Sequence, residues 1–251
     1  MKQFQMQEEQ YIFPYHYIPH IDRKGMVNRY RLVSRGYEYL CYMLHIKEII
    51  DDISPKSILD VGCGDGRLIS LLTEYDEISY TGVDISSKAI SFAKAFNPNV
   101  EFINIDVKKI ERKYDLVSLI EVMEHIPDLI IEEFMDDVIS KIKIGGYLII
   151  SVPSINIPLQ KKHYRHYDIN TLIKDIKPEE NGLTVLSIEY IFNGSNLIYK
   201  YWHKLTSNRY SVIIVPILEQ IFWNFIWKRL RIARNNNGKH IVALLRKNEE
   251  I

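Results

Sequence analysis

The sequence LDVGCGDGRL occupies residues 59–68 and lies between two apolar segments of different character. The segment at 57–62 is a short apolar run that ends in glycine, which predicts a buried strand. The segment at 66–75 predicts a helix. A strand, a glycine-rich loop and a helix in this order are typical of the first unit of an α/β fold.

Glycines stand at alternate positions in this loop, at Gly62, Gly64 and Gly66. Because glycine has no side chain, the backbone can turn tightly here and approach a ligand closely. A dinucleotide-binding loop would read G-x-G-x-x-G, but Arg67 stands where its last glycine would be. The acidic Asp60 beside the loop favours a cationic ligand group over a pyrophosphate.

The chain beyond this loop alternates apolar strands with helices. Further strands are predicted at 78–84, 100–106, 114–122, 147–153, 183–191 and 239–247, and helices at 86–96, 129–142 and 169–176. Ser86 or Ser87 is expected to cap the first of these helices, and Gly145 and Gly146 to end the second. The pattern predicts a doubly wound, mostly parallel seven-stranded sheet, covered on both faces.

Residues 1–54 precede the sheet and form a region of their own, ahead of a main domain at 55–251. Residues 1–26 have no clear period and predict an irregular arm, while 27–51 have helical spacing that is clear only up to Leu44. Two interpretations of the arm remain open: a lid over the ligands, or an arm packed onto the core. The lid would consist of aromatic and histidine side chains: Tyr11, Phe13, Tyr15, His16, Tyr17 and His20.

An insertion at 193–238 separates the last two strands. Pro216, Glu219 and Gln220 argue against a membrane span. The segment could be a helix buried against the core or against a homodimer partner. Alternatively, residues 210–234 could lie on a membrane surface. Aromatic side chains (Trp223, Phe225, Trp227) would then lie at the interface and basic ones (Lys228, Arg229, Arg231, Arg234) near anionic headgroups.

Composition limits the function classes. Lysine and arginine number 32, as do aspartate and glutamate, so the formal net charge is zero. A nucleic-acid-binding protein usually has a basic excess, so nucleic acid is not the favoured partner. The two cysteines, Cys41 and Cys63, cannot form a disulfide framework or a C-x-x-C zinc site, and no signal peptide is evident. These features predict a cytoplasmic protein, with peripheral attachment at the inner membrane surface left open.

The D-x-G-x-G-x-G loop and the acidic strand ends that follow it resemble the class I S-adenosylmethionine-dependent methyltransferases, over roughly residues 55–192 and the last strand. The resemblance implies a Rossmann-like methyltransferase fold with S-adenosylmethionine as cofactor. Asp60, Gly62 and Gly64 would hold its methionine end, Asp84 its ribose hydroxyls and Asp106 its adenine amino group. Glu121 would face the cofactor. The full set of implied cofactor-binding residues is Asp60, Gly62, Cys63, Gly64, Asp84, Ile85, Asp106, Val107 and Glu121.

The motif E-V-M-E-H at 121–125 brings carboxylates and an imidazole close in sequence. On a helical turn, Glu121, Glu124 and His125 would share one face. With His166 they could ligate a divalent metal, and His163 is a further candidate ligand. This set resembles that of the small-RNA 3′-terminal ribose 2′-O-methyltransferases. The same stretch also resembles ubiquinone-pathway and other small-molecule methyltransferases, so a site without metal is favoured.

The segment HYRHYD at 163–168 follows the fifth strand, where ligands bind in such folds. Histidine is the usual general base near neutral pH, so His125, His163 and His166 are the candidate catalytic residues, with Asp168 weaker. The favoured function is direct in-line O-methylation of a small-molecule, sugar or glycan, or lipid-linked acceptor. The alternatives are a metal-dependent RNA 3′-terminal ribose methyltransferase and a non-catalytic binding module with this fold.

Overall fold

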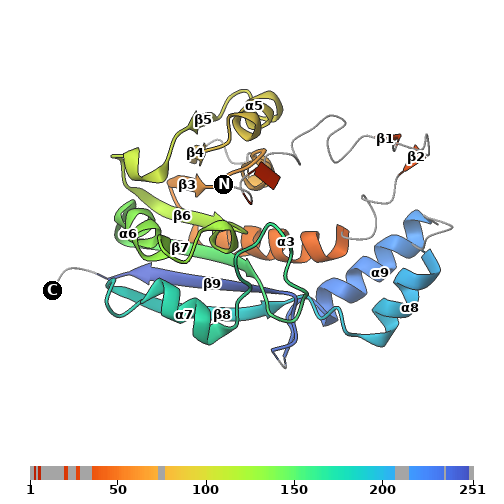
Figure 1. Cartoon of the computed structure of the whole chain (residues 1–251). Helices are drawn as coiled ribbons and strands as arrows, with labels where there is room; N and C mark the ends of the chain where they lie inside the picture. The colour runs from red at the N-terminus through yellow and green to blue at the C-terminus, as the bar shows by residue number, and fades with distance from the viewer. Residues whose placement is uncertain are drawn as a thin grey trace.

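A seven-stranded sheet forms the centre of the protein (Figure 1). The structure is a computed structural model that describes residues 3, 5–6, 20–21, 27–28, 36–72, 77–206, 215–234 and 236–248. The strands are β3 (Ser57–Val61), β4 (Ser79–Asp84), β5 (Glu101–Asn104), β6 (Tyr114–Ile120), β7 (Ile142–Pro153), β8 (Leu183–Ile191) and β9 (His240–Lys247). Their order in the sheet is β5-β4-β3-β6-β7-β9-β8.

All strands of this sheet run parallel except β9, which pairs antiparallel with β7 and β8. The chain winds outward in one direction from β3 to β5 and in the other from β6 onward. The direction therefore reverses between β3 and β6. In open α/β sheets, ligands bind at the carboxyl ends of the strands beside such a reversal. The predicted doubly wound, mostly parallel sheet is confirmed.

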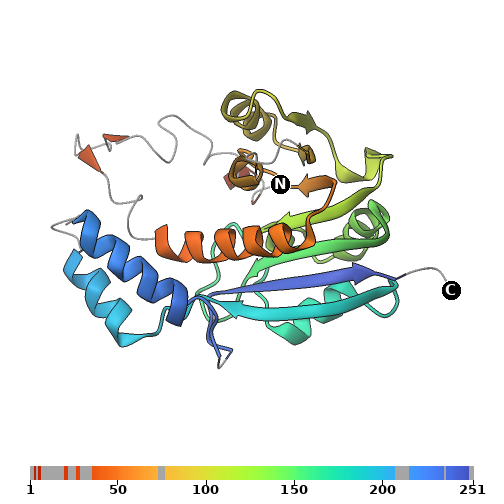
Figure 2. The same cartoon turned by 180° about the vertical axis from the view of Figure 1, so that it is seen from behind.

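Helices cover both faces of the sheet (Figures 1 and 2). They are α3 (Gly36–Ile53), α4 (Arg67–Leu72), α5 (Ser87–Phe96), α6 (Ile131–Ser140), α7 (Ile169–Ile176), α8 (Leu197–Thr206) and α9 (Pro216–Arg229). Neighbouring strand residues point to opposite faces. Ile58 therefore packs in the cluster that contains α3, α4, α8 and α9, whereas Leu59 packs in the cluster that contains α6 and α7.

Several predicted boundaries agree with the structure. Ser86 caps α5, because its hydroxyl accepts a hydrogen bond from the Ala89 amide at 3.1 Å. Helix α7 spans the predicted residues, and its N-cap is Asp168, which forms a reciprocal capping box with Thr171. Asp168 therefore has a structural role as a helix cap, which removes the ground for treating it as a base.

Two predicted boundaries were wrong. The helix expected from residue 27 begins at Gly36, because Val27–Asn28 instead forms β2, which pairs with β1 (His20–Ile21). Helix α6 ends at Ser140, before Gly145 and Gly146, which lie inside β7. The glycines belong to a bulge: Tyr114 pairs with Ile142, but Leu116 pairs with Tyr147. A Cβ on Gly146 would lie 2.9 Å from two backbone oxygens, so this bend needs glycine.

The regions outside the sheet are described in part. The aromatic side chains of the lid hypothesis, at 11–20, lie outside the described residues. The insertion at 193–238 contains α8 and α9. The residues that join these two helices, 207–214, also lie outside the described residues. Within the described parts of the chain, no helix combines the length and the apolar character that a membrane crossing requires.

Candidate functional site

The glycine loop after β3 is held against β4 by its own backbone. The amides of Gly62 and Cys63 both donate to the Val83 carbonyl oxygen, at 2.8 and 3.0 Å. Gly62 has a φ of +69°, and a Cβ there would lie 2.5 Å from the Val122 side chain. Both facts require glycine, since a side chain would be strained and would also collide. The loop thus presents bare backbone, and Val122 from the E-V-M-E-H segment packs directly on it.

Asp84 stands at the carboxyl end of β4 and is joined to this loop. Its Oδ2 accepts a hydrogen bond from the Gly64 amide at 2.9 Å, and its Oδ1 accepts one from the Ser86 amide at 2.8 Å. A carboxylate has about four acceptor positions, so hydroxyl groups of a ribose can bind beside these two amides. Gly64 and Asp84, two of the implied cofactor residues, are therefore in direct contact, and their binding of a cofactor stays a prediction.

Asp60 is the buried acid of this region. Its side chain is 3% exposed and accepts a hydrogen bond from the Ser118 hydroxyl at 2.7 Å. Burial raises the pKa of Asp60 to about 7, since charge is costly away from water. A cationic group bound at the loop would favour the ionised form. The loop, Asp60 and Asp84 therefore fit a ligand with an amino group at one end and a ribose at the other.

The other implied cofactor residues lie around the same strand ends. The Asp106 carboxylate caps the 3-10 helix η1 (Val107–Lys109) by accepting from the Lys108 amide. Val107 is buried in the core, while Ile85 is 60% exposed. Cys63 is buried, and burial raises the pKa of its thiol well above the ordinary value, so it stays neutral. Contact of these residues with the cofactor stays a prediction.

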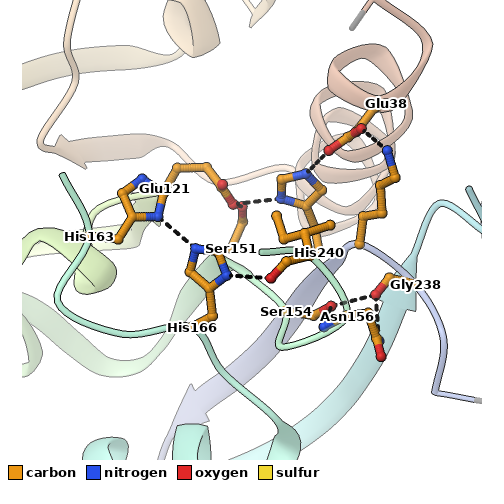
Figure 3. A network of polar contacts seen from close by, with 11 residues as sticks. Glu38, Glu121, Ser151, Ser154, Asn156, His163, His166, Gly238 and His240 are labelled. Atoms are coloured by element: carbon orange, nitrogen blue, oxygen red, sulfur yellow. Dashed lines mark hydrogen bonds and ion pairs between the residues drawn. The ribbon is translucent and has the colours of Figure 1, made fainter. Parts of the chain in front are cut away.

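Beyond the reversal point, Glu121 belongs to a chain of charged side chains, of which His240 is buried and the others are partly buried (Figure 3). Its Oε1 accepts from the Ser151 hydroxyl at 2.5 Å and from His240 Nδ1 at 3.1 Å. His240 Nε2 donates to Glu38 Oε1 at 3.0 Å, and Lys239 donates to the other Glu38 oxygen at 2.6 Å. An imidazole between two carboxylates is protonated.

The pKa values in this chain follow from its charges. Although burial opposes it, the carboxylates of Glu121 and Glu38 raise the pKa of His240 to about 10. Burial likewise opposes ionisation of Glu38, but His240 and Lys239 lower the pKa of Glu38 to about 2. Glu121 has a left-handed backbone, with φ +56°, which is uncommon for a residue with a side chain. The resemblance implied that Glu121 faces the cofactor, and here its carboxylate is turned to His240 and Ser151.

Three further histidines lie beside this network, and their hydrogen bonds define their protonation. His166 Nδ1 lies 3.1 Å from the Ile157 carbonyl oxygen, so this nitrogen carries the proton. Its Nε2 then accepts from His163 Nδ1 at 2.8 Å, which leaves His163 Nε2 with the lone pair. Burial lowers the pKa of His163 to about 3 and also lowers that of His166, so both imidazoles are neutral.

His125 and Glu124 complete this cluster from the 3-10 helix η2 (Met123–His125). His125 Nδ1 donates to the Lys162 carbonyl oxygen at 3.2 Å, so its lone pair is also on Nε2. Burial lowers the pKa of His125 to about 4 and raises that of Glu124 well above its ordinary value. Glu124 is 1% exposed, and its Oε2 has no hydrogen-bond partner among the described residues.

Three of these residues could hold a metal ion. Glu124, His125 and His163 each offer a ligand atom, and these atoms lie within 4.8 Å of one another. The sequence-based set was Glu121, Glu124, His125 and His166. The structure instead turns Glu121 to His240 and places His166 behind His163. A buried carboxylate with neutral imidazoles is a donor set that suits a divalent transition metal.

Arg165 fixes the two histidine-bearing segments to each other. Its Nη1 donates to the Met123 carbonyl oxygen at 3.1 Å and to the Tyr167 hydroxyl at 3.0 Å, and its Nε donates to Asp128 at 2.8 Å. The loop that carries His163 is thereby tied to η2. Sequence reasoning missed Arg165, as it missed Glu38, Ser151 and His240, because nothing in their local sequence marks them as neighbours.

Comparison with known proteins agrees with this geometry. The family described as "Methyltransferase domain" matches residues 35–188. The ubiquinone biosynthesis O-methyltransferase of Nitrosomonas europaea is 32% identical over 120 residues, which cover 45% of this chain and 50% of that protein. That of Rickettsia bellii is 35% identical over 112 residues, covering 42% and 45%. The chain thus spans about half the length of these curated relatives.

A solved structure supports the same fold. The N-methyltransferase NodS from Bradyrhizobium japonicum, in complex with S-adenosylhomocysteine, superimposes with a TM-score of 0.63. The superposition covers 99% of this chain and all of that one, at 13% identity. At 13% identity this structural similarity shows the fold alone. The assignment to a protein family rests on the family match at residues 35–188. The chain belongs to the methyltransferase-domain family.

Proposed function

We propose that this methyltransferase acts on a hydroxyl oxygen of a small-molecule, sugar or glycan, or lipid-linked acceptor, with His163 as the general base. The observation that carries the proposal is the hydrogen-bond order Ile157–His166–His163, which puts a lone pair on His163 Nε2. The O-methyltransferase relatives support an oxygen acceptor. They do not favour an RNA acceptor or a non-catalytic module.

The two halves of the site would divide the work. When bound, the cofactor supplies an electrophilic methyl group on a positively charged sulfur. Asp60 and Asp84 hold the amino and ribose ends, and the bare loop lets the ligand lie against the backbone. Holding the acceptor oxygen in line with the methyl group removes much of the entropic cost of a two-molecule reaction.

His163 would remove the proton that the acceptor loses. As the new carbon–oxygen bond forms, the hydroxyl proton passes to His163 Nε2. His163 Nδ1 can then release its own proton to His166 Nε2, 2.8 Å away. The low pKa of His163 makes it a weak base, so the transfer is expected to occur together with methyl transfer and not before it.

Two measurements test the proposal: the affinity for the cofactor, and methyl transfer to a panel of possible acceptors. Calorimetry with S-adenosylmethionine and S-adenosylhomocysteine, with and without EDTA, should show micromolar binding that EDTA does not change. Radiolabelled methyl transfer is then measured to phenols, sugars, polyprenyl-linked precursors and RNA 3′ ends. Label on an oxygen of one of the first three supports the proposal. Transfer only to a nitrogen, or only to RNA, contradicts it.

A second candidate is a metal-assisted form of the same reaction. The buried Glu124 Oε2 lies beside His125 and His163 and has no hydrogen-bond partner among the described residues, which favours this candidate because a buried polar atom needs a partner. A bound divalent ion would polarise the acceptor hydroxyl. The matched variants are Glu124→Gln, which replaces the carboxyl group by an amide at nearly constant volume, and Glu132→Gln at an exposed position of α6. If Glu124→Gln keeps full activity, and EDTA has no effect, this candidate is wrong.

A further inference from the structure

Helices α8 and α9 lie in the insertion between β8 and β9 and pack against the rest of the protein with one side only (Figures 1 and 2). One side of each helix is already used for packing. Tyr199 from α8 and Phe222 and Ile226 from α9 are buried in the cluster that includes α3. The Trp202 and Phe222 rings stack at 4.5 Å. Any apolar side chain on the other sides is therefore not needed for the core.

Those other sides are nevertheless apolar. Six large apolar side chains on the two helices are each more than half exposed: Leu197, Ile198, Tyr201 and Leu205 on α8, and Ile217 and Ile221 on α9. On α8 they follow one stripe, since Leu197, Tyr201 and Leu205 are spaced by four residues. Single exposed apolar residues are ordinary, but a concentration of this kind marks an interaction surface.

A basic hollow lies at the carboxyl end of α9, beside Asn193 just after β8. It has a volume of about 460 Å³, and its lining includes Asn193, Trp227 and four cationic side chains. These are Lys228, Arg229, Arg231 and Arg234. Arg231 pairs with Glu48 at 2.5 Å and stacks over the Trp227 ring, but its buried Nε has no hydrogen-bond partner among the described residues.

The other three cations lack a counter-charge within the described parts of the chain. Lys228, Arg229 and Arg234 form no ion pair with any residue that the structure describes. The formal net charge of the whole chain is zero, so this is a local excess. A pocket with three uncompensated cations and an unused guanidinium donor favours an anionic group with several oxygens, such as a phosphate.

We propose that α8 and α9 dock onto a membrane that contains anionic phospholipid. The basic hollow receives a headgroup phosphate, and the exposed apolar side chains of the two helices enter the boundary of the acyl chains. Charge complementarity at the hollow selects this occupant over a second copy of the chain, which would bring the same positive charge to the contact. The inference goes beyond the proposed function and does not depend on which acceptor is methylated.

Vesicle co-sedimentation of the full chain tests the proposal. Neutral phosphatidylcholine vesicles are compared with vesicles that contain one third phosphatidylglycerol. Binding to the anionic vesicles should be at least tenfold tighter and should weaken as salt is raised from 0.05 to 0.5 M. No binding to either vesicle, or equal binding to both, overturns the proposal.

Variants assign the effect to this surface. The pair Lys228→Ser and Arg229→Ser should weaken vesicle binding about 20- to 30-fold, since each cation near an anionic surface contributes roughly fivefold. Leu205→Ser with Ile221→Ser should also weaken it. The matched controls, Lys94→Ser with Lys113→Ser and Ile144→Ser, alter exposed residues elsewhere and should bind like the parent chain. All variants should keep their affinity for S-adenosylmethionine, which verifies the fold.

Two further measurements separate other occupants. Calorimetry with glycerol 3-phosphate tests whether a soluble phosphate suffices: binding of this compound without vesicle binding overturns the lipid assignment. Analytical ultracentrifugation tests for a second copy. A dimer that Leu205→Ser and Ile221→Ser dissociate, with no vesicle binding, would make this surface a contact between protomers and would also overturn the proposal.

Discussion

The two halves of the site are built in opposite ways. The half at β3 and β4 is made of backbone and two carboxylates, all within residues 60–86. The half at β6, β7 and β9 is made of histidines and glutamates from segments as distant as Glu38 and His240. The first half is local and acidic, whereas the second is assembled from remote segments and rich in imidazole.

Because the two halves are built from different residues, a substitution in one half should change the property that depends on that half and leave the property of the other half unchanged. The largest effect is expected for His163→Ala, which removes the proposed base. The turnover number should fall by about 10²- to 10⁴-fold, while affinity for S-adenosylmethionine stays unchanged because His163 is not joined to the glycine loop. Stopped assays of methyl transfer and calorimetry check the two quantities. The control is His203→Ala on α8. A turnover number within threefold of the parent would contradict the role of His163.

The next largest effect concerns folding stability. His240→Gln removes the cation from Glu121 and leaves Glu38 paired with Lys239 alone, which should cost about 3 kcal/mol of unfolding free energy near pH 6. His240 has a folded pKa of about 10, above its ordinary value of 6.5. Its contribution is therefore fully present below pH 6.5 and is lost as pH rises towards 10.

Denaturant unfolding of parent and variant at pH 6 and pH 9.5 tests that pH dependence. The difference between the two proteins should be smaller at the higher pH. A difference that is equal at both pH values would show that His240 is neutral in the folded protein. Lys143→Gln, which removes an exposed ion pair with Asp115, is the control and should cost little at either pH.

Asp84→Ala should act on the first half alone. Loss of charged hydrogen bonds to the ribose should weaken S-adenosylmethionine binding by about 1.5–3 kcal/mol, or roughly 10- to 150-fold. The turnover number at saturating cofactor should change much less. Calorimetry gives the affinity, and Asp136→Ala on the exposed side of α6 is the control. Unchanged affinity would mean that the ribose binds elsewhere.

The smallest effect is the pH dependence of cofactor affinity. The Asp60 pKa is about 7 without ligand, and the ionised form is the one that attracts a cationic amino group. As pH falls from 7 to 5.5, binding must expel a proton, so affinity should fall by up to about tenfold per pH unit. The amino group itself stays charged over this range. Asp60→Asn should bind weakly and without this slope, and a slope that persists in Asp60→Asn would assign it to another group.

The sequence permits prediction of the first half because its parts are neighbours in the chain. Gly62, Gly64 and Asp84 sit at strand ends, and parallel strands bring their carboxyl ends to one edge. The His163–His166 pair and Glu124–His125 were also found, since each pair is close in sequence. The pairing of Glu124 and His125 with His163 was found only in part, because Glu121 and His166 were placed in the same set.

The contacts of the second half between remote segments could not be predicted, and the reason is physical. Glu38 and His240 meet only because β9 enters the sheet beside β7 and because α3 crosses the same face. No periodicity or motif records such a contact. Gly145 and Gly146 show the same limit: as sequence they look like a helix stop, but the pairing of β6 with β7 makes them a bulge.

The position of β9 in the sheet also determines when the enzyme can become complete. Contacts within 57–120 span short loops, so the cofactor half can form early during folding. Strand β9, which carries His240 and follows α9 in the chain, must instead pair between β7 and β8. The contact of His240 with Glu121 closes a loop of 119 residues. A chain that has folded all but β9 would therefore bind its cofactor with an unfinished acceptor half.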